Sequence, residues 1–164
     1  MSLDQSSTER NFAAYVGIDW ADRQHAVCLL DGTGHIDQEL EHSPEAIAAW
    51  AEALRQRYGG LPVAVALEQS RGPLIYALMQ YAHLVLFPIN PKQLARYREA
   101  LSVGGKKDDP TDAQLLARFL RDHRDCVRAW QPEEAQTREL ARLCELRRNI
   151  VESRKKTVQS SRRR

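Results

Sequence analysis

The chain has 164 residues, 43% of them apolar, which is enough for one domain with its own core and an appendage. No apolar run approaches the roughly 20 residues that span a bilayer, and the polar start, residues 1–12, reads as a disordered lead-in without a signal peptide's apolar core. The three cysteines are widely spaced and form no zinc-type pair, so we expect a cytoplasmic protein with reduced thiols rather than a membrane or secreted one.

The net charge of +2 hides a difference between the two halves of the chain. Residues 1–90 carry 5 Lys/Arg against 11 Asp/Glu, whereas residues 91–164 carry 19 against 11. An acidic half can hold cations and a basic half can hold phosphates. The balance therefore favours a protein that acts on nucleic acid.

The first elements predict an antiparallel meander. Residues 13–19 are mostly apolar and read as a central strand, and residues 25–31 form a second strand. The Asp-Gly turn at residues 31–34 is typical of a hairpin and leads into a third strand over residues 35–41, near an edge of the sheet.

Helices then alternate with strands. Ser43 is a good N-cap for a helix that ends at Tyr58-Gly59-Gly60, and a strand over residues 61–67 follows it. A helix between two strands implies that the strands are parallel. The elements expected after them are a helix over 71–81, a strand over 83–89, a helix over 91–99, a helix from 109 or 110 to about 120, a connector over 122–131 and a long helix from 132.

This order predicts an α/β fold of the ribonuclease-H-like (RuvC-like) kind. Three antiparallel strands followed by parallel strands that helices connect would make one mixed five-stranded sheet. We expect that domain to occupy residues 13–125, with a connector and a coiled-coil-like helix over residues 126–164.

Four short segments resemble the amino-terminal domain of the DEDD-type insertion-sequence transposases, which are bacterial relatives of the pilin-gene invertase and of the bridge-RNA-guided recombinases. The segments are Gly17-Ile18-Asp19, Leu67-Glu68, Asn90-Pro91 and residues 107–113. The Asp-x-x-Asp-Ala pattern after a lysine-bearing loop is the most specific of them. The resemblance extends over about residues 13–160.

The resemblance implies a metal site for phosphoryl transfer on DNA. The family's four catalytic, metal-binding acids would be Asp19, Glu68, Asp109 and Asp112, with Asp108 as the alternative to Asp109. Two carboxylates about 4 Å apart repel by roughly 4 kcal/mol at an effective dielectric near 20, so four converging acids need cations. Ligation by oxygen alone selects Mg²⁺ or Mn²⁺.

Each of these residues also has a simpler interpretation. Asp19 could bond to nearby backbone amides, and Glu68 could pair with Arg71. Asp109 could be an N-cap with Pro110 as the first helical residue, and Asp112 could then favour the positive end of the helix dipole. Two neighbours of Asp19, Asp22 and His25, are expected to face water, and Trp20 is expected to pack over the end of the strand.

Basic residues and an apolar stripe suggest the partners. Leu140, Leu143, Leu146 and Ile150 recur at helical spacing and predict a homodimer or higher oligomer through the terminal helix. DNA is the expected main partner, a structured guide RNA is a further candidate, and DNA binding would place the protein on the nucleoid. The expected phosphate-binding residues are Arg96, Arg98, Lys106, Lys107, Arg154, Lys155 and Lys156.

The function predicted is that of a transposase or site-specific recombinase. In the family a second domain supplies a catalytic serine, and this chain stops before such a domain, so we expect this polypeptide alone to be incomplete for recombination. Two alternatives stay open, a non-catalytic module that binds nucleic acid or dimerises and a RuvC-like Holliday-junction nuclease. A sugar-kinase or actin-like ATPase is disfavoured because Trp20-Ala21-Asp22 replaces the phosphate hairpin that follows the first acid in those proteins.

Overall fold

The computed structural model describes residues 11–68, 72–103 and 110–131, together with residues 143, 146, 147, 150 and 154. The chain divides into two compact units, residues 1–130 and residues 131–164. The first unit contains the sheet and its helices.

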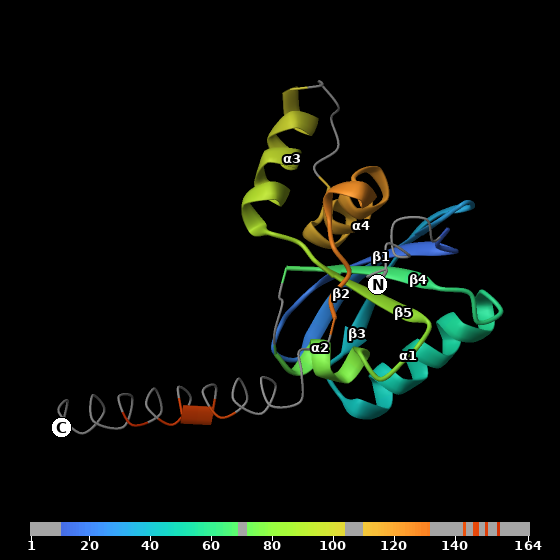
Figure 1. Cartoon of the computed structure of the whole chain (residues 1–164), viewed down its shortest axis with the longest axis vertical. Helices are drawn as coiled ribbons and strands as arrows, with labels where there is room; N and C mark the ends of the chain where they lie inside the picture. Colours follow the sequence, from blue (N-terminus) through green and yellow to red (C-terminus); the bar gives the residue numbers. More distant parts are fainter. Residues whose placement is uncertain are drawn as a thin grey trace, which may run out of the picture. The chain divides into compact units, whose positions relative to one another are not determined.

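One five-stranded mixed sheet forms the centre of the first unit (Figure 1). Its order is β3-β2-β1-β4-β5, with β2 antiparallel to both β1 and β3 and with β4 parallel to both β1 and β5. The meander, the parallel crossover and the edge position of the third strand are therefore confirmed, and the topology is the ribonuclease-H-like one expected. The strands are β1 (Ala14–Asp19), β2 (Gln24–Asp31), β3 (Gly34–Glu41), β4 (Val63–Leu67) and β5 (Leu84–Pro88).

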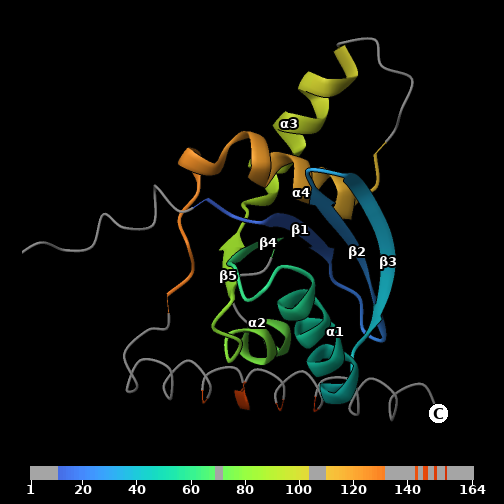
Figure 2. The same ribbon diagram turned by 90° about the vertical axis from the view of Figure 1, so that its right-hand side faces the viewer.

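Helices lie on both faces of this sheet (Figure 2). On one face are α1 (Pro44–Arg57) and α2 (Pro73–Leu78), and on the other is α4 (Asp112–Asp122), with α3 (Pro91–Val103) against α4. A short 3-10 helix, Arg124–Cys126, follows α4. The layered arrangement buries both faces of the central strands, which explains why β4 is apolar throughout.

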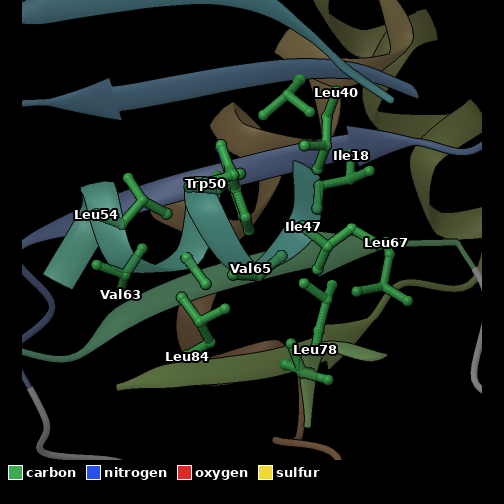
Figure 3. Close-up of a cluster of buried hydrophobic side chains, with 14 of the residues drawn as sticks. Ile18, Leu40, Ile47, Trp50, Leu54, Val63, Val65, Leu67, Leu78 and Leu84 are labelled. Carbon is green, nitrogen blue, oxygen red and sulfur yellow. The ribbon is translucent and has the colours of Figure 1, made fainter. Parts of the chain in front are cut away.

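The core under α1 is built from alternate residues of the strands (Figure 3). Ile18 of β1 and Val65 of β4 point to this side and meet Ile47 and Trp50 of α1. Ser43 caps α1 by accepting a hydrogen bond from the backbone N–H of Ala46, as the sequence predicts.

The opposite face admits α4 unusually close to β1. A Cβ atom added at Gly17 would lie 2.0 Å from the carbonyl oxygen of Ala113 and 2.6 Å from the backbone nitrogen of Ala117. No side chain fits in that space, so glycine at this position lets the helix backbone rest on the strand. This contact holds the first turn of α4 beside the end of β1.

Three helix boundaries differ from the sequence-based prediction. Helix α2 is shorter than residues 71–81 and ends at Leu78, and α3 continues past Glu99 to Val103. Helix α4 begins at Asp112, so the interpretation with Asp109 as N-cap and Pro110 as first helical residue is wrong.

The cap of α4 is Thr111. Its hydroxyl accepts from the backbone N–H of Gln114, whose side chain accepts in return from the N–H of Thr111. Threonine followed three residues later by glutamine satisfies two helix donors at once, which an aspartate two residues earlier cannot do.

In the second unit the described residues Leu143, Leu146, Arg147, Ile150 and Arg154 are helical. The side chains of Leu143, Leu146 and Ile150 are 53–60% exposed. Leu140 and most of the long helix expected from residue 132 lie outside the described residues. Within the parts of the chain that the structure describes, no helix is long and apolar enough to cross a membrane.

Candidate metal and nucleic-acid site

Asp19 and Glu68 meet at one edge of the sheet. Asp19 is the last residue of β1, and Glu68 directly follows β4. The two strands are parallel and Ile18 pairs with Leu67, so both acids leave the sheet at the same level. They line an open pocket of about 200 Å³ together with Trp20, Leu67 and Leu74.

Asp112 completes a group of three acids. It is the first residue of α4, the helix that Gly17 holds against β1. Burial and then the charge of Asp112 raise the pKa of Asp19. Burial, Asp112 and Asp19 raise the pKa of Glu68, while Arg98 lowers it. Neighbouring negative charge therefore disfavours the charged forms of Asp19 and Glu68, which is the electrostatic condition that a cation would relieve.

Arg98 of α3 reaches into this group. Its guanidinium forms an ion pair with the carboxylate of Asp112, and both side chains are about half exposed. The residue expected to bind phosphate thus faces the acids directly. The sequence places Arg98 near Asp112 along the chain but does not pair the two, because that contact depends on how α3 packs on α4.

The donor chemistry fits Mg²⁺ or Mn²⁺, because all three acids offer carboxylate oxygen alone. Among the residues that the structure describes, no three His, Cys, Asp or Glu side chains stand close enough to hold one ion as they are placed. Release of Asp112 from Arg98 would free its carboxylate for a ligand role. Asp108 and Asp109 lie outside the described residues, as does Arg71, the alternative partner of Glu68.

His25 is buried, so the expectation that it faces water is wrong; Asp22 is exposed, as expected. The Nδ1 atom of His25 accepts a hydrogen bond from the backbone N–H of Ala21 at 3.1 Å, which leaves the proton on Nε2 to donate to Nδ1 of His42 at 3.0 Å. Burial and the neighbouring His42 lower the pKa of His25.

The alternation of β2 could have revealed this burial. His25 shares its face of the strand with Val27 and Leu29, which are both buried. The pair of histidines fixes the loop that follows Asp19. Trp20 in that loop lies against the ring of His25, with centroids 6.4 Å apart, yet keeps 38% of its surface exposed.

The predicted phosphate-binding residues are only partly described. Arg96 and Arg98 are exposed on α3, and Arg154 is exposed in the second unit. Lys106, Lys107, Lys155 and Lys156 lie outside the described residues.

Comparison with known families gives a match over almost the whole chain. Residues 16–163 match the family model described as a transposase, DEDD_Tnp_IS110. This family is the one suggested by the residues around Asp19, Glu68 and Asp112.

Two curated relatives are transposases by description. The chain is 34% identical over 139 residues to transposase y4uE of Sinorhizobium fredii, which covers 80% of this chain and 38% of the relative. It is 37% identical over 118 residues to the mini-circle transposase for IS117 of Streptomyces coelicolor, which covers 69% of this chain and 28% of the relative. The chain thus spans about a third of the length of the curated relatives that it matches.

A solved structure of Thermus thermophilus RuvC in complex with a Holliday junction substrate was also matched, at 16% sequence identity and a TM-score of 0.46. The match covers 71% of this chain and 98% of that chain.

Proposed function

The chain belongs to the IS110-type DEDD transposase family, and on this premise we propose that it carries the acidic, metal-binding half of the reaction centre of a DNA transposase or recombinase. The observation that supports the proposal most is the group formed by Asp19, Glu68 and Asp112. Elements from three separate parts of the chain carry these acids, and burial and the charge of neighbouring acids raise the pKa of both Asp19 and Glu68.

Asp19, Glu68 and Asp112, with Asp109 or Asp108, would hold Mg²⁺ or Mn²⁺. When bound, such ions supply charge stabilisation for phosphoryl transfer at DNA. Glu68 and Asp19 border the pocket in which a phosphate would lie. Arg98 would exchange its ion pair with Asp112 for a contact with that phosphate, since a guanidinium binds carboxylate and phosphate oxygens alike.

DNA is the proposed substrate, and Arg96, Lys106, Lys107, Arg154, Lys155 and Lys156 are the proposed sequence-independent phosphate contacts. A structured guide RNA is proposed as a second partner on the family resemblance. Self-association through the stripe of Leu140, Leu143, Leu146 and Ile150 is proposed from its apolar spacing.

Metal binding is the direct test. Wild-type protein in chelator should gain thermal stability on addition of Mg²⁺ or Mn²⁺, with half-saturation at about millimolar or tighter. Asp19→Asn should abolish that gain. In chelator it should itself be more stable than the wild type by about 0.5 kcal/mol, because it removes repulsion between a partly buried carboxylate and its like-charged neighbours.

Asp22→Asn is the matched control, since Asp22 is an exposed acid three residues from Asp19 and outside the pocket. It should respond to metal as the wild type does. Equal metal stabilisation of the wild type and of Asp19→Asn would contradict the proposal.

A non-catalytic nucleic-acid-binding module is the alternative, and one observation favours it. Arg98 forms an ion pair with Asp112, so a side chain of the protein itself can balance the charge of this carboxylate. That module would bind DNA, but Mg²⁺ or Mn²⁺ would not raise its thermal stability. The test concentration is on the order of 10 mM, well above the millimolar affinity expected of a working site.

A further inference from the structure

Trp20 presents a large aromatic surface at the acids. It follows Asp19 directly, lines the same pocket as Asp19 and Glu68, and is 38% exposed. The other two tryptophans differ from it, since Trp50 is buried and Trp130 packs against the core under α1. More than a third of this indole is left in contact with solvent beside two carboxylates, which directs attention to what it could bind.

The indole of Trp20 contacts the buried ring of His25. Its ring is tilted by 30° on the ring of His25, which is fully buried. His25 in turn is fixed by the N–H of Ala21 and by His42, whose ring meets it edge-on at 88°. Trp20 therefore rests on an anchored support, and its exposed surface borders the pocket.

We propose that Trp20 is a stacking platform for a nucleobase next to the phosphate that lies at Asp19 and Glu68. This rests on the proposed function, because it takes the pocket to be a site for a nucleic-acid strand. Every nucleobase has a face that stacks on an indole, and the base attached to a bound phosphate is the nearest aromatic group available. A base already stacked inside a duplex does not offer its face, so the platform selects an unpaired base of a distorted or single-stranded DNA segment.

Substitutions at Trp20 separate aromatic stacking from apolar volume. Trp20→Leu should weaken binding of a fluorescein-labelled single-stranded 12-mer by roughly tenfold, on the order of one lost base–aromatic stack. Trp20→Phe keeps an aromatic face and should stay within about threefold of the wild type. Ile36→Ala, which shortens a 43% exposed side chain on β3, is the matched control and should bind as the wild type does.

An abasic scan locates the base. One nucleotide at a time is replaced by an abasic site, and at one position this should strongly weaken binding by the wild type. The same replacement should hardly change binding by Trp20→Leu, because that variant already lacks the indole on which the base stacks. If the losses of binding free energy from the abasic site and from Trp20→Leu add at every position, the proposal is overturned. Wild-type affinity in Trp20→Leu, or a wild type that does not bind the oligonucleotide, would also overturn it.

Fluorescence gives a readout that does not depend on the folding of Trp20→Leu. The double variant Trp50→Phe, Trp130→Phe retains Trp20 as its single tryptophan, so all tryptophan emission comes from that residue. A stacked base should quench its emission, and the abasic oligonucleotide should not; equal quenching by both contradicts stacking. Metal-dependent stabilisation, measured in parallel, separates the proposed function from the stacking proposal. If the protein is stabilised by metal but Trp20 and the abasic position act independently, only the stacking proposal fails.

Discussion

At the scale of single residues, burial acts in opposite directions on the ionisable groups around the pocket. It raises the pKa of the carboxyl groups of Asp19 and Glu68 and lowers the pKa of His25. Both shifts follow from one cause, because low polarity disfavours whichever form carries charge. A bound cation would favour the charged form of the acids, whereas the lowered pKa of His25 favours its neutral form, which acts through its hydrogen bonds.

We expect His25 to make stability fall in mild acid. Its folded-state pKa lies below the unfolded value near 6.5, so the unfolded chain takes up a proton first. This contribution is fully present above about pH 6.5 and is lost as the pH falls towards the folded-state pKa, by at most about 1.4 kcal/mol per pH unit. Unfolding in urea between pH 5 and 8 (roughly the range in which histidine titrates) measures it.

Comparison of variants isolates this effect, because Asp19 and Glu68, with raised pKa values, act in the opposite sense. His25→Gln removes the titrating group but can still accept and donate hydrogen bonds, and it should flatten the pH dependence. His35→Gln, which replaces an exposed imidazole on β3, is the comparison. Identical pH profiles for the two variants would count against the role of His25.

At the scale of elements, α4 decides whether the acids meet. Its apolar face packs on β1, β2 and β4, and its first residue is Asp112. Two local features hold the helix in register with the sheet. They are the absence of a side chain at Gly17 and the capping box at Thr111.

Gly17→Ala should be severely destabilising. The new methyl group would overlap the backbone of α4 at Ala113 and Ala117, and backbone cannot move aside as a flexible side chain can. We expect a loss of about 3 kcal/mol or more in chemical denaturation, accompanied by loss of metal-induced stabilisation.

Gly32→Ala is the matched control, since a Cβ atom there would meet nothing within 4 Å. Its stability should lie within about 0.5 kcal/mol of the wild type. A near-neutral Gly17→Ala would show that α4 is not held as tightly against β1 as the structure has it.

Loss of a helix cap can be compared at two places in the fold. Thr111→Ala and Ser43→Ala each remove a side-chain hydroxyl that caps a helix, so each should cost about 1 kcal/mol of stability. Only Thr111 precedes a proposed metal ligand. Thr111→Ala should therefore also weaken the apparent affinity for Mg²⁺ in a calorimetric titration, and equal metal affinities in the two variants would refute that link.

At the scale of the whole molecule, charge is divided along the chain. Both parts carry 11 Asp/Glu, but residues 1–90 have only 5 Lys/Arg whereas residues 91–164 have 19, so the first part is net negative and the second net positive. The family match extends over both parts, from residue 16 to residue 163. A net negative part favours cations and a net positive part favours phosphates, which agrees with the proposed function.

Binding of DNA should therefore depend steeply on salt. Each neutralised phosphate releases counterions, so the logarithm of the binding constant should fall linearly with that of the salt concentration. The double variant Lys106→Ala, Lys107→Ala should reduce the slope by about two. The loss of affinity should depend only weakly on the DNA sequence. Anisotropy titrations at several salt concentrations measure both, and a flat salt dependence would contradict phosphate-dominated binding.

Self-association is expected from the second unit. Leu143, Leu146 and Ile150 are helical and more than half exposed, and each leucine contributes roughly 1.5–3 kcal/mol when fully buried. After the cost of association this supports a dimer with a dissociation constant in the micromolar range. Sedimentation of a strict monomer at about 100 µM would refute it.

The sequence by itself determined the strands, their directions and the acids at their ends. Short, mostly apolar runs define β1 and β2, the Asp-Gly turn makes β2 and β3 antiparallel, and a crossover helix makes β1 and β4 parallel. These are local patterns, so one chain segment at a time is enough to read them. They also place Asp19 and Glu68 at one edge, because parallel strands end on the same side.

Tertiary structure alone decided which groups face one another. The polarity of His25 predicts that it faces water, but its strand carries it into the interior, where the N–H of Ala21 and the ring of His42 provide its hydrogen bonds. The ion pair between Arg98 and Asp112 needs two helices to pack together. Such contacts join residues that no local pattern relates, since burial and pairing depend on the partner that the fold supplies and not on the residue alone.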